Sequence, residues 1–279
     1  MSQKIFLDYN GQKEEYVLTK DEPQKPYIEF NDYYLRLTTI SQGFMDINGL
    51  SPYIQRYLYS GNKDGVLRKI DIYGNSEAWS YDLKSNINSV SLDRENNIYV
   101  AIRNRIIKLK DKNIICDYDI ENNKILVKDN MIYVVKNNQL IKYNIEGKEQ
   151  WRYTNRTKIK DVCIDNFQSI YLTTNNKIIK INYMLKMLWE YDIENVELIV
   201  LGKDNKIYVT TDKIIIELKD GLKIKEWNIG ENISALSVDE DSEIYYVNNE
   251  TIKKINKKNK QLWNSTSGYV INSIALEDK

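Results

Sequence analysis

The residue types that most often carry enzyme chemistry are incomplete in this sequence, because it contains no histidine. Histidine is the commonest general base and a common metal ligand, so His-dependent triads and most zinc-type sites are excluded. Chemistry that uses carboxylates alone, as in glycoside hydrolysis, stays open. The two cysteines, Cys116 and Cys163, fall in predicted strands as small buried thiols and do not indicate a disulfide scaffold.

The best candidate for a cation site is the acidic run DEDSE at residues 239–243, whose oxygen atoms could hold calcium. Asp239, however, stands in register with Asp93 and Asp165, and each of the three opens a predicted turn. An aspartate at that position hydrogen-bonds the backbone of its own turn, which is a structural role. We therefore favour the turn interpretation, and the sequence predicts no catalytic residue, no metal ligand and no cofactor.

These side chains belong to a repeated unit that is clearest between Ile159 and Ile193. Four short β-type segments are predicted there: Asp161–Ile164, Ile170–Thr173, Ile178–Ile181 and Leu188–Ile193. Alternating apolar positions, β-branched residues and aromatics, bounded by Asn and Asp, favour strands over a helix.

All five tryptophans occupy one position of this unit: Trp79, Trp151, Trp189, Trp227 and Trp263. They are separated by 72, 38, 38 and 36 residues, and Cys116 stands at the midpoint of the first interval. Six copies of about 37 residues fit the period of four-stranded propeller blades. The sequence therefore predicts an all-β fold, a β-propeller.

A second column places lysine in the third strand of nearly every copy: Lys69, Lys108, Lys142, Lys180 and Lys254. The lysines could form a positive ring, and the tryptophans could stack sugars or bases. A residue that recurs in almost every blade is better explained by packing. We expect the Trp rings to fill the space between blades and the Lys stems to cover apolar strand surface, with each ammonium near solvent or a carboxylate.

The two ends of the chain suggest how the ring closes. Ile5–Gly11 aligns with the second strand of a copy, whereas Ile271–Leu276 copies the first strand Ile87–Leu92. We predict seven blades, the closing blade being shared between residues 1–31 and 268–279, with six repeats in 46–267 and the whole of 1–279 in one domain. Six blades with an N-terminal β-hairpin is the alternative.

The tryptophan follows a turn, as in Asp71–Gly74 before Trp79 and Asn144–Gly147 before Trp151. With this feature the repeat resembles that of the quinoprotein-like (PQQ-repeat, WD40-like) propeller superfamily, over Ile47–Ser267. The superfamily includes quinone-dependent dehydrogenases, outer-membrane assembly lipoproteins and interaction modules. This sequence lacks the vicinal cysteines of the first group and the export signal with a lipid-accepting cysteine of the second. The resemblance therefore implies the fold without a cofactor.

Residues 32–45 match nothing in the repeat and form a predicted insertion. Its Tyr33, Tyr34, Arg36 and Phe44 are residue types that contribute binding energy at protein interfaces. We predict that they bind a partner protein. The alternative is that the segment packs on the propeller as an extra strand.

The function predicted at this point is a non-catalytic structural or protein-binding component of a larger assembly, such as the baseplate of a phage tail or a contractile bacteriocin. The formal net charge of zero and the pI near 6.5 argue against nucleic acid as a partner. No stretch predicts membrane insertion or a signal peptide, so cytoplasmic synthesis is expected, with assembly into a virion-like particle. The alternative is a carbohydrate-binding or carboxylate-based hydrolytic propeller that uses its central channel. Inward Asp, Glu and Tyr would favour the alternative, and a plugged apolar channel would not.

Overall fold

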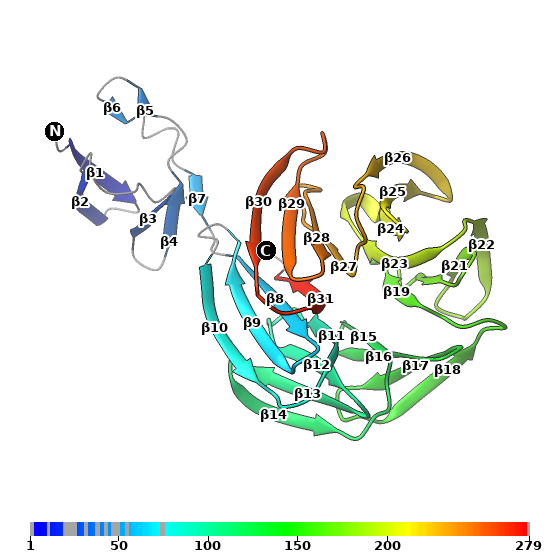
Figure 1. The fold of residues 1–279 in the computed structure, drawn as a ribbon. Helices are drawn as coiled ribbons and strands as arrows, with labels where there is room; N and C mark the ends of the chain where they lie inside the picture. Colours follow the sequence, from blue (N-terminus) through cyan, green and yellow to red (C-terminus); the bar gives the residue numbers. More distant parts are fainter. Residues whose placement is uncertain are drawn as a thin grey trace. The chain divides into compact units, whose positions relative to one another are not determined.

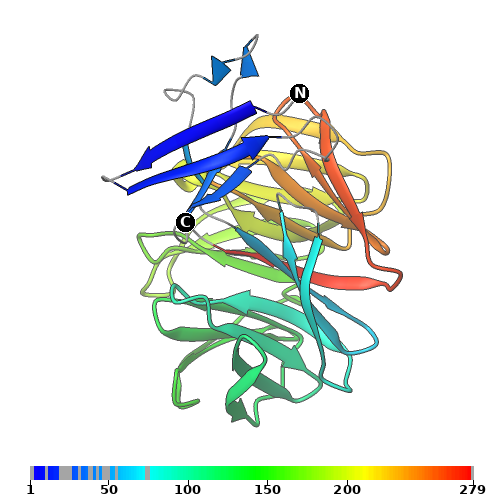
Figure 2. The same cartoon turned by 90° about the vertical axis from the view of Figure 1, so that its left-hand side faces the viewer.

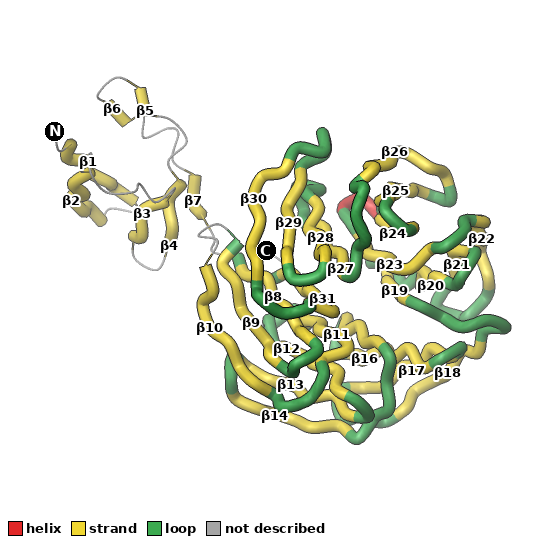
Figure 3. Tube along the Cα trace, in the orientation of Figure 1, coloured by secondary structure: helices red, strands yellow, loops and turns green. Residues whose placement is uncertain are grey.

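The computed structural model describes residues 56–72 and 76–277 in full, and between residues 3 and 53 it describes only the backbone of short strands. The chain divides into two compact units, one mainly of residues 1–56 and one mainly of residues 57–278. In the fully described part, strands and turns account for the structure apart from one 3₁₀ turn at Lys203–Asn205 (Figure 3). No helix among the described residues is long and apolar enough to cross a membrane.

The larger unit is a ring of six antiparallel four-stranded sheets within the described residues (Figures 1 and 2). Blades 2 to 6 each use four consecutive strands, ordered from the centre outward. Blade 2 has β11 (Ile87–Leu92), β12 (Ile98–Ile102), β13 (Arg105–Lys110) and β14 (Asn113–Tyr118). Blade 3 has β15 (Lys124–Lys128), β16 (Met131–Lys136), β17 (Gln139–Asn144) and β18 (Glu149–Thr154).

The next three blades repeat this arrangement. Blade 4 has β19 (Asp161–Ile164), β20 (Ile170–Thr173), β21 (Lys177–Ile181) and β22 (Met187–Asp192). Blade 5 has β23 (Val196–Leu201), β24 (Ile207–Thr211), β25 (Ile214–Lys219) and β26 (Leu222–Asn228). Blade 6 has β27 (Ala235–Val238), β28 (Ile244–Asn248), β29 (Thr251–Ile255) and β30 (Gln261–Thr266). The four strands expected between Ile159 and Ile193 are thus confirmed as blade 4.

Blade 1 closes the ring with strands from both ends of the repeat region. Its inner strand is β31 (Ile271–Leu276), which pairs with β8 (Tyr57–Asn62), followed by β9 (Val66–Asp71) and β10 (Ser76–Asp82). Because β31 covers the inner edge of β8, blade 1 becomes a four-stranded sheet like the other five, and the ring is closed.

The prediction of a seventh blade is wrong, and the structure has the six-bladed alternative. Residues Ile47–Ser51 (INGLS) resemble the inner strand at Ile87–Ser91 (INSVS), and the prediction of six repeats in 46–267 rests on that resemblance. It left Ile271–Leu276 to pair near the N-terminus. Instead β7 (Ser51–Tyr53) pairs with β4 (Tyr33–Arg36), and β8 is therefore free to pair with β31. The pairing of β8 with β31 completes a four-stranded sheet, which stabilises the ring more than a strand formed by the few residues at 47–51 would.

The N-terminal unit holds the predicted hairpin as a separate two-stranded sheet. Its strands β1 (Gln3–Tyr9) and β2 (Gln12–Leu18) pair with Tyr9 opposite Gln12. A three-stranded sheet joins β3 (Tyr27–Phe30), β4 and β7, and a two-stranded sheet joins β5 (Ile40–Ser41) to β6 (Phe44–Met45).

Burial explains why the repeat has its sequence pattern. In blade 4, every residue of β19 and β20 is buried, whereas the outermost β22 alternates between exposed and half-buried residues. Apolar residues from neighbouring blades meet between the sheets. Trp189, for example, meets the ring of Tyr171 in its own blade edge-on and packs against a core cluster that also contains Val196 and Ile207 of blade 5. The prediction that the tryptophans pack between blades is confirmed.

An acidic side chain fixes the turn after the inner strand. Oδ1 of Asp165 accepts hydrogen bonds from the N–H groups of Phe167 (2.9 Å) and Ser169 (2.8 Å). Its Oδ2 accepts the hydroxyl hydrogen of Tyr171 at 3.1 Å and lies 3.6 Å from Nζ of Lys180. Blade 6 repeats the motif around Asp239, so the turn interpretation of that residue is confirmed.

The same position carries Asp93 in blade 2 and Glu277 in blade 1, each facing a lysine of the predicted column. This confirms that the ammonium groups of Lys69, Lys108, Lys180 and Lys254 lie beside carboxylates, whereas Lys142 of blade 3 lies over the ring of Tyr133. Blade 5 inverts the pair, because Gly202 replaces the acid and Glu217 replaces the lysine, and Lys206 lies 2.6 Å from Glu217. Blade 3 alone, among the six described blades, has lysine in the acid position, at Lys128.

Candidate functional site in the central channel

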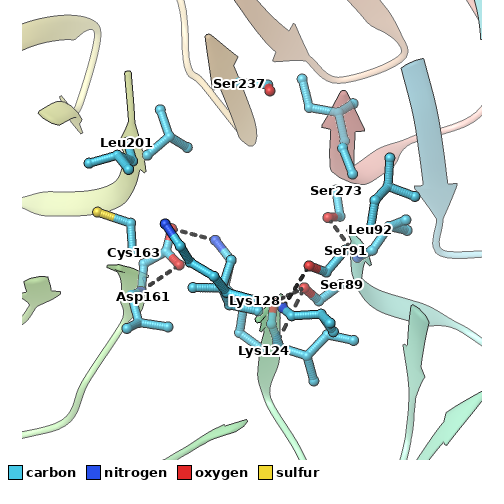
Figure 4. A pocket seen from close by; sticks show the side chains of 18 of the residues that line it. Ser89, Ser91, Leu92, Lys124, Lys128, Asp161, Cys163, Leu201, Ser237 and Ser273 are labelled. Atoms are coloured by element: carbon cyan, nitrogen blue, oxygen red, sulfur yellow. Dashed lines mark hydrogen bonds and ion pairs between the residues drawn. The ribbon is translucent and has the colours of Figure 1, made fainter. Parts of the chain in front are cut away.

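The inner strands of all six blades line a cavity of about 340 Å³ on the axis of the ring (Figure 4). Its wall combines aliphatic residues with small ones, among them Ser91, Cys163, Ser237 and Ser273. The cavity extends to the turns that follow the inner strands, where it is lined by Arg94, Asp129 and Asn166. We call this end the channel mouth.

One position of the inner strand links neighbouring blades through polar side chains. The hydroxyl of Ser273 accepts the N–H of Val90 at 3.0 Å, and Oδ2 of Asp161 accepts the N–H of Ile199 at 3.0 Å. The hydroxyl of Ser89 accepts the N–H of Ile125 at 3.3 Å. In each case the side chain satisfies a backbone donor of the next inner strand, as a buried N–H group requires. These polar groups are structural.

Lys124 breaks that pattern between blades 3 and 4. It occupies the same position of the repeat, but an ammonium group has no lone pair with which to accept a hydrogen bond. It donates instead to Asp161, and the second oxygen of Asp161 accepts the N–H of Val162 at 2.7 Å. Asp161 is only 2% exposed, and three donors surround its carboxylate.

Lys128 lies at the opposite end of β15, at the channel mouth. Its blade makes the turn with two residues, Asp129 and Asn130, whose φ angles are 50° and 57°. Such a two-residue turn needs no side-chain acceptor to hold it. The acid of the other blades is therefore dispensable here, and a lysine can take its place.

The side chain of Lys128 reaches across to blade 4 (Figure 4). Its Nζ donates to the carbonyl oxygen of Ile164 at 2.9 Å and to Oδ1 of Asn166 at 3.0 Å. Burial lowers the pKa of the Lys128 amine, although the nearby Asp129 carboxylate opposes the shift. The lysine therefore loses its proton more readily than one in water.

Asp129 connects the three blades around this lysine. Its Oδ1 lies 2.7 Å from Nη2 of Arg94 in blade 2, and its Oδ2 accepts a hydrogen bond of 2.7 Å from Nε2 of Gln168 in blade 4. The channel mouth thus gathers a guanidinium, an amine, a carboxylate and two amides within one network.

The chemistry open to this arrangement is proton transfer by an amine. The cavity wall also includes three carboxylates, but Asp93 holds its turn, Asp161 has three donors, and Asp129 is bound by Arg94 and Gln168. Burial raises the pKa of the Cys163 thiol well above its usual value, so that sulfur is a poor nucleophile. Among the described residues, no group of three or more His, Cys, Asp and Glu side chains is placed to hold a metal ion.

The partner-binding residues predicted in the insertion are not part of this site. Tyr33, Tyr34 and Arg36 fall in β4 and Phe44 falls in β6, and their side chains lie outside the described residues. Their role in binding a partner stays a prediction. The sequence analysis missed Lys124 and Lys128, although an alignment of the inner strands alone would have shown lysine where most other blades carry Ser, Asp or Glu.

Comparison with known proteins shows the fold. No family model and no curated protein matches the sequence. Among solved structures, a protein of unknown function from Bacteroides caccae superposes with a TM-score of 0.68 at 10% identity, over 81% of this chain and 100% of its own. Virginiamycin B lyase from Staphylococcus aureus has a TM-score of 0.51 at 17% identity, over 63% of this chain and 68% of its own. A streptogramin B lyase has a TM-score of 0.54 at 15% identity, over 74% and 72% of the two chains.

This chain is a six-bladed β-propeller. The comparisons overturn the prediction of a non-catalytic component of a phage tail or bacteriocin, since two of these solved structures are enzymes. That prediction was reached by excluding other functions, and it took the absence of histidine to mean that the protein has no catalytic site. The channel wall includes Lys124, Lys128 and three aspartates, so the channel is not the plugged apolar one that would have counted against the alternative. The channel-based alternative is the better supported of the two.

Proposed function

We propose that this propeller is an enzyme that transforms a small polar substrate in its central channel, with Lys128 as the group that takes up and returns a proton. The observation that carries the proposal is the replacement of a structural acid by Lys128 at the channel mouth. In blades 1, 2, 4 and 6 that position stabilises a turn, a tyrosine or a lysine of its own blade. In blade 3 it faces the cavity and blade 4.

The hydrogen bonds of Lys128 suit a general base. The two acceptors, Ile164 O and Asn166 Oδ1, bind two of the three N–H bonds that an ammonium carries. When the third proton leaves, the amine can keep both hydrogen bonds and present its lone pair. A lowered pKa brings this group toward the working pH of an enzyme, which is where general bases are most effective.

The two similar lyases support the reaction class. A lyase breaks a bond by elimination, and an elimination often begins with the removal of a proton from carbon. Lys128 could perform that step without histidine, and Arg94 lies across Asp129 from it, at the same end of the cavity. The resemblance of the repeat to quinoprotein-like propellers remains our expectation for the superfamily, supported by the packing of the Trp column.

The first test measures the proton affinity of Lys128 directly. Competitive acetylation with limiting acetic anhydride, read by peptide mass spectrometry between about pH 7 and pH 10, reports the free-amine fraction of each lysine. We expect Lys128 to react at lower pH in the folded protein than in the chain unfolded by denaturant, because burial lowers the pKa of its amine. Coincident titration of Lys128 in the two states would contradict the proposal.

The second test measures turnover. Virginiamycin B is the first compound to incubate with the protein, because a similar structure is a lyase named for it, and cellobiose and digalacturonate are the next. For a compound that is converted, Lys128→Met and Lys128→Arg should both lower kcat by at least about 100-fold, since neither side chain can act as the base. Lys186→Met is the matched control. Conversion by Lys128→Met at the wild-type rate would place the chemistry elsewhere.

A further inference from the structure

A second feature of the channel mouth is an aromatic ring that the propeller does not need. Phe167 is 74% exposed and stands at the tip of the turn between β19 and β20. The corresponding turn positions of blades 2, 5 and 6 carry Glu95, Asp204 and Asp241. The turn therefore folds with a charged residue at its tip, and packing does not require Phe167.

Hydrogen bonds within the turn hold the backbone of Phe167 in a fixed place. The N–H of Phe167 donates to Asp165, and Asp165 is itself buried and bound to Ser169 and Tyr171. The N–H of Gln168, which has a φ of 63°, donates to the carbonyl oxygen of Asp165 at 3.2 Å. An exposed apolar ring on a rigid turn loses little conformational entropy when a ligand covers it.

The residues on either side of Phe167 tie the turn to the channel mouth. Asn166 accepts from Lys128 and Gln168 donates to Asp129, so the ring stands between two contacts with the cavity wall. Each amide uses one polar atom in these contacts. The other atoms, Nδ2 of Asn166 and Oε1 of Gln168, have no hydrogen-bond partner among the described residues, which leaves a donor and an acceptor beside the ring.

We infer that this turn binds a sugar ring, with Phe167 stacking on its C–H face and Asn166 and Gln168 bonding its hydroxyl groups. A pyranose has an apolar face and a polar rim, and an aromatic ring flanked by amides matches both. Arg94 and Asp129 add a donor and an acceptor of balanced charge at the same mouth. The inference deepens the proposed function and rests on it, because it names a carbohydrate as the substrate class for the reaction at Lys128.

Binding can be measured without turnover by saturation-transfer NMR on cellobiose, maltose, chitobiose and digalacturonate, with the whole chain. We expect at least one of the four sugars to bind, with the strongest transfer to the C–H protons of one ring face. Phe167→Glu, which installs the residue of blade 2, should weaken that binding by at least about tenfold, and Phe167→Tyr should keep it. Both variants should melt with the wild type, because the side chain is exposed.

Tyr183 provides the matched control, since it is 66% exposed in the same blade but stands in the turn between β21 and β22. Tyr183→Ser should bind as the wild type does. The inference is wrong if none of the four sugars binds, or if Phe167→Glu binds like the wild type. Acetylation of Lys128 does not depend on Phe167, so a failure here is distinguishable from a failure of the proposed proton transfer.

Discussion

Blades 3 and 4 are neighbours built from one repeat, and they use the same two positions of the inner strand in opposite ways. Blade 4 places Asp161 and Asp165 there, and both carboxylates accept backbone N–H groups. Blade 3 places Lys124 and Lys128 there, and both lysines donate to blade 4. One blade supplies acceptors to the scaffold, and the other extends cationic side chains along the channel.

The difference follows from local backbone geometry. A turn of five residues in blade 4 leaves N–H groups that Asp165 must satisfy, whereas the two-residue turn of blade 3 satisfies its own. Removing that requirement allows a residue of another charge. In a repeat protein, a position that has lost its structural role can acquire a chemical one, and this is the origin that we propose for the roles of Lys128 and Phe167.

The largest expected effect is at the tryptophan position, where blades 3 and 4 keep the same residue and should contribute equally to stability. Trp151→Ala and Trp189→Ala should each lower the free energy of unfolding by about 3–5 kcal/mol, because each ring packs between its own blade and the next. Denaturant unfolding measures both. Costs that differ by more than about 2 kcal/mol would show that the blades already differ in their packing.

The next test separates the partners of the ion pair between the blades. Asp161→Ala should cost about 3 kcal/mol, since it leaves Lys124 and the buried N–H of Ile199 without an acceptor. Lys124→Met should cost about 1 kcal/mol, because Asp161 keeps its two N–H donors. Urea midpoints at constant m-value give both numbers. Equal costs would mean that the ammonium group, and not the backbone, is what Asp161 chiefly serves.

Sequence reasoning found what the repeat enforces and missed what departs from it. The strands, the Trp column and the role of Asp239 were predictable because several copies of the repeat carry the same residue type at the same position. The closure through β31 was not, because a short resemblance at Ile47–Ser51 competed with a pairing that spans most of the chain. The lysines of β15 were missed because the alternation of apolar and polar residues predicts only which face of a strand is buried. The contacts that Lys124 and Lys128 make across the channel become visible only in the folded ring.

A smaller effect is expected at the acid position itself. Asp165→Ala should cost about 2 kcal/mol, because the N–H groups of Phe167 and Ser169 and the hydroxyl of Tyr171 lose their acceptor. Lys128→Met should change stability by less than about 0.5 kcal/mol, since its blade makes the turn without it. Thermal unfolding of both variants compares the positions directly. A loss at Lys128 as large as that at Asp165 would show that the lysine has a structural role after all.

The smallest effect is the contribution of Lys128 to the dependence of stability on pH. Burial lowers the pKa of this amine in the folded protein, so between the folded value and the unfolded one the unfolded chain binds more protons. The free energy of unfolding contributed by Lys128 should therefore rise with pH across that interval. Burial acts in the opposite sense on the tyrosines, and raises the pKa of Tyr171 and Tyr133, but these groups are common to both proteins in the comparison.

The measurement is the difference in unfolding free energy between wild type and Lys128→Met, followed from about pH 7 to about pH 10. The free energy of unfolding of the wild type should rise relative to that of the variant as pH rises. Lys128 would then be the residue whose charge is disfavoured by the fold yet retained at the channel mouth, as a proton-transfer role requires. A difference that is flat with pH would show that the Lys128 amine titrates alike in the folded and unfolded chain, which removes the basis for assigning it the proton.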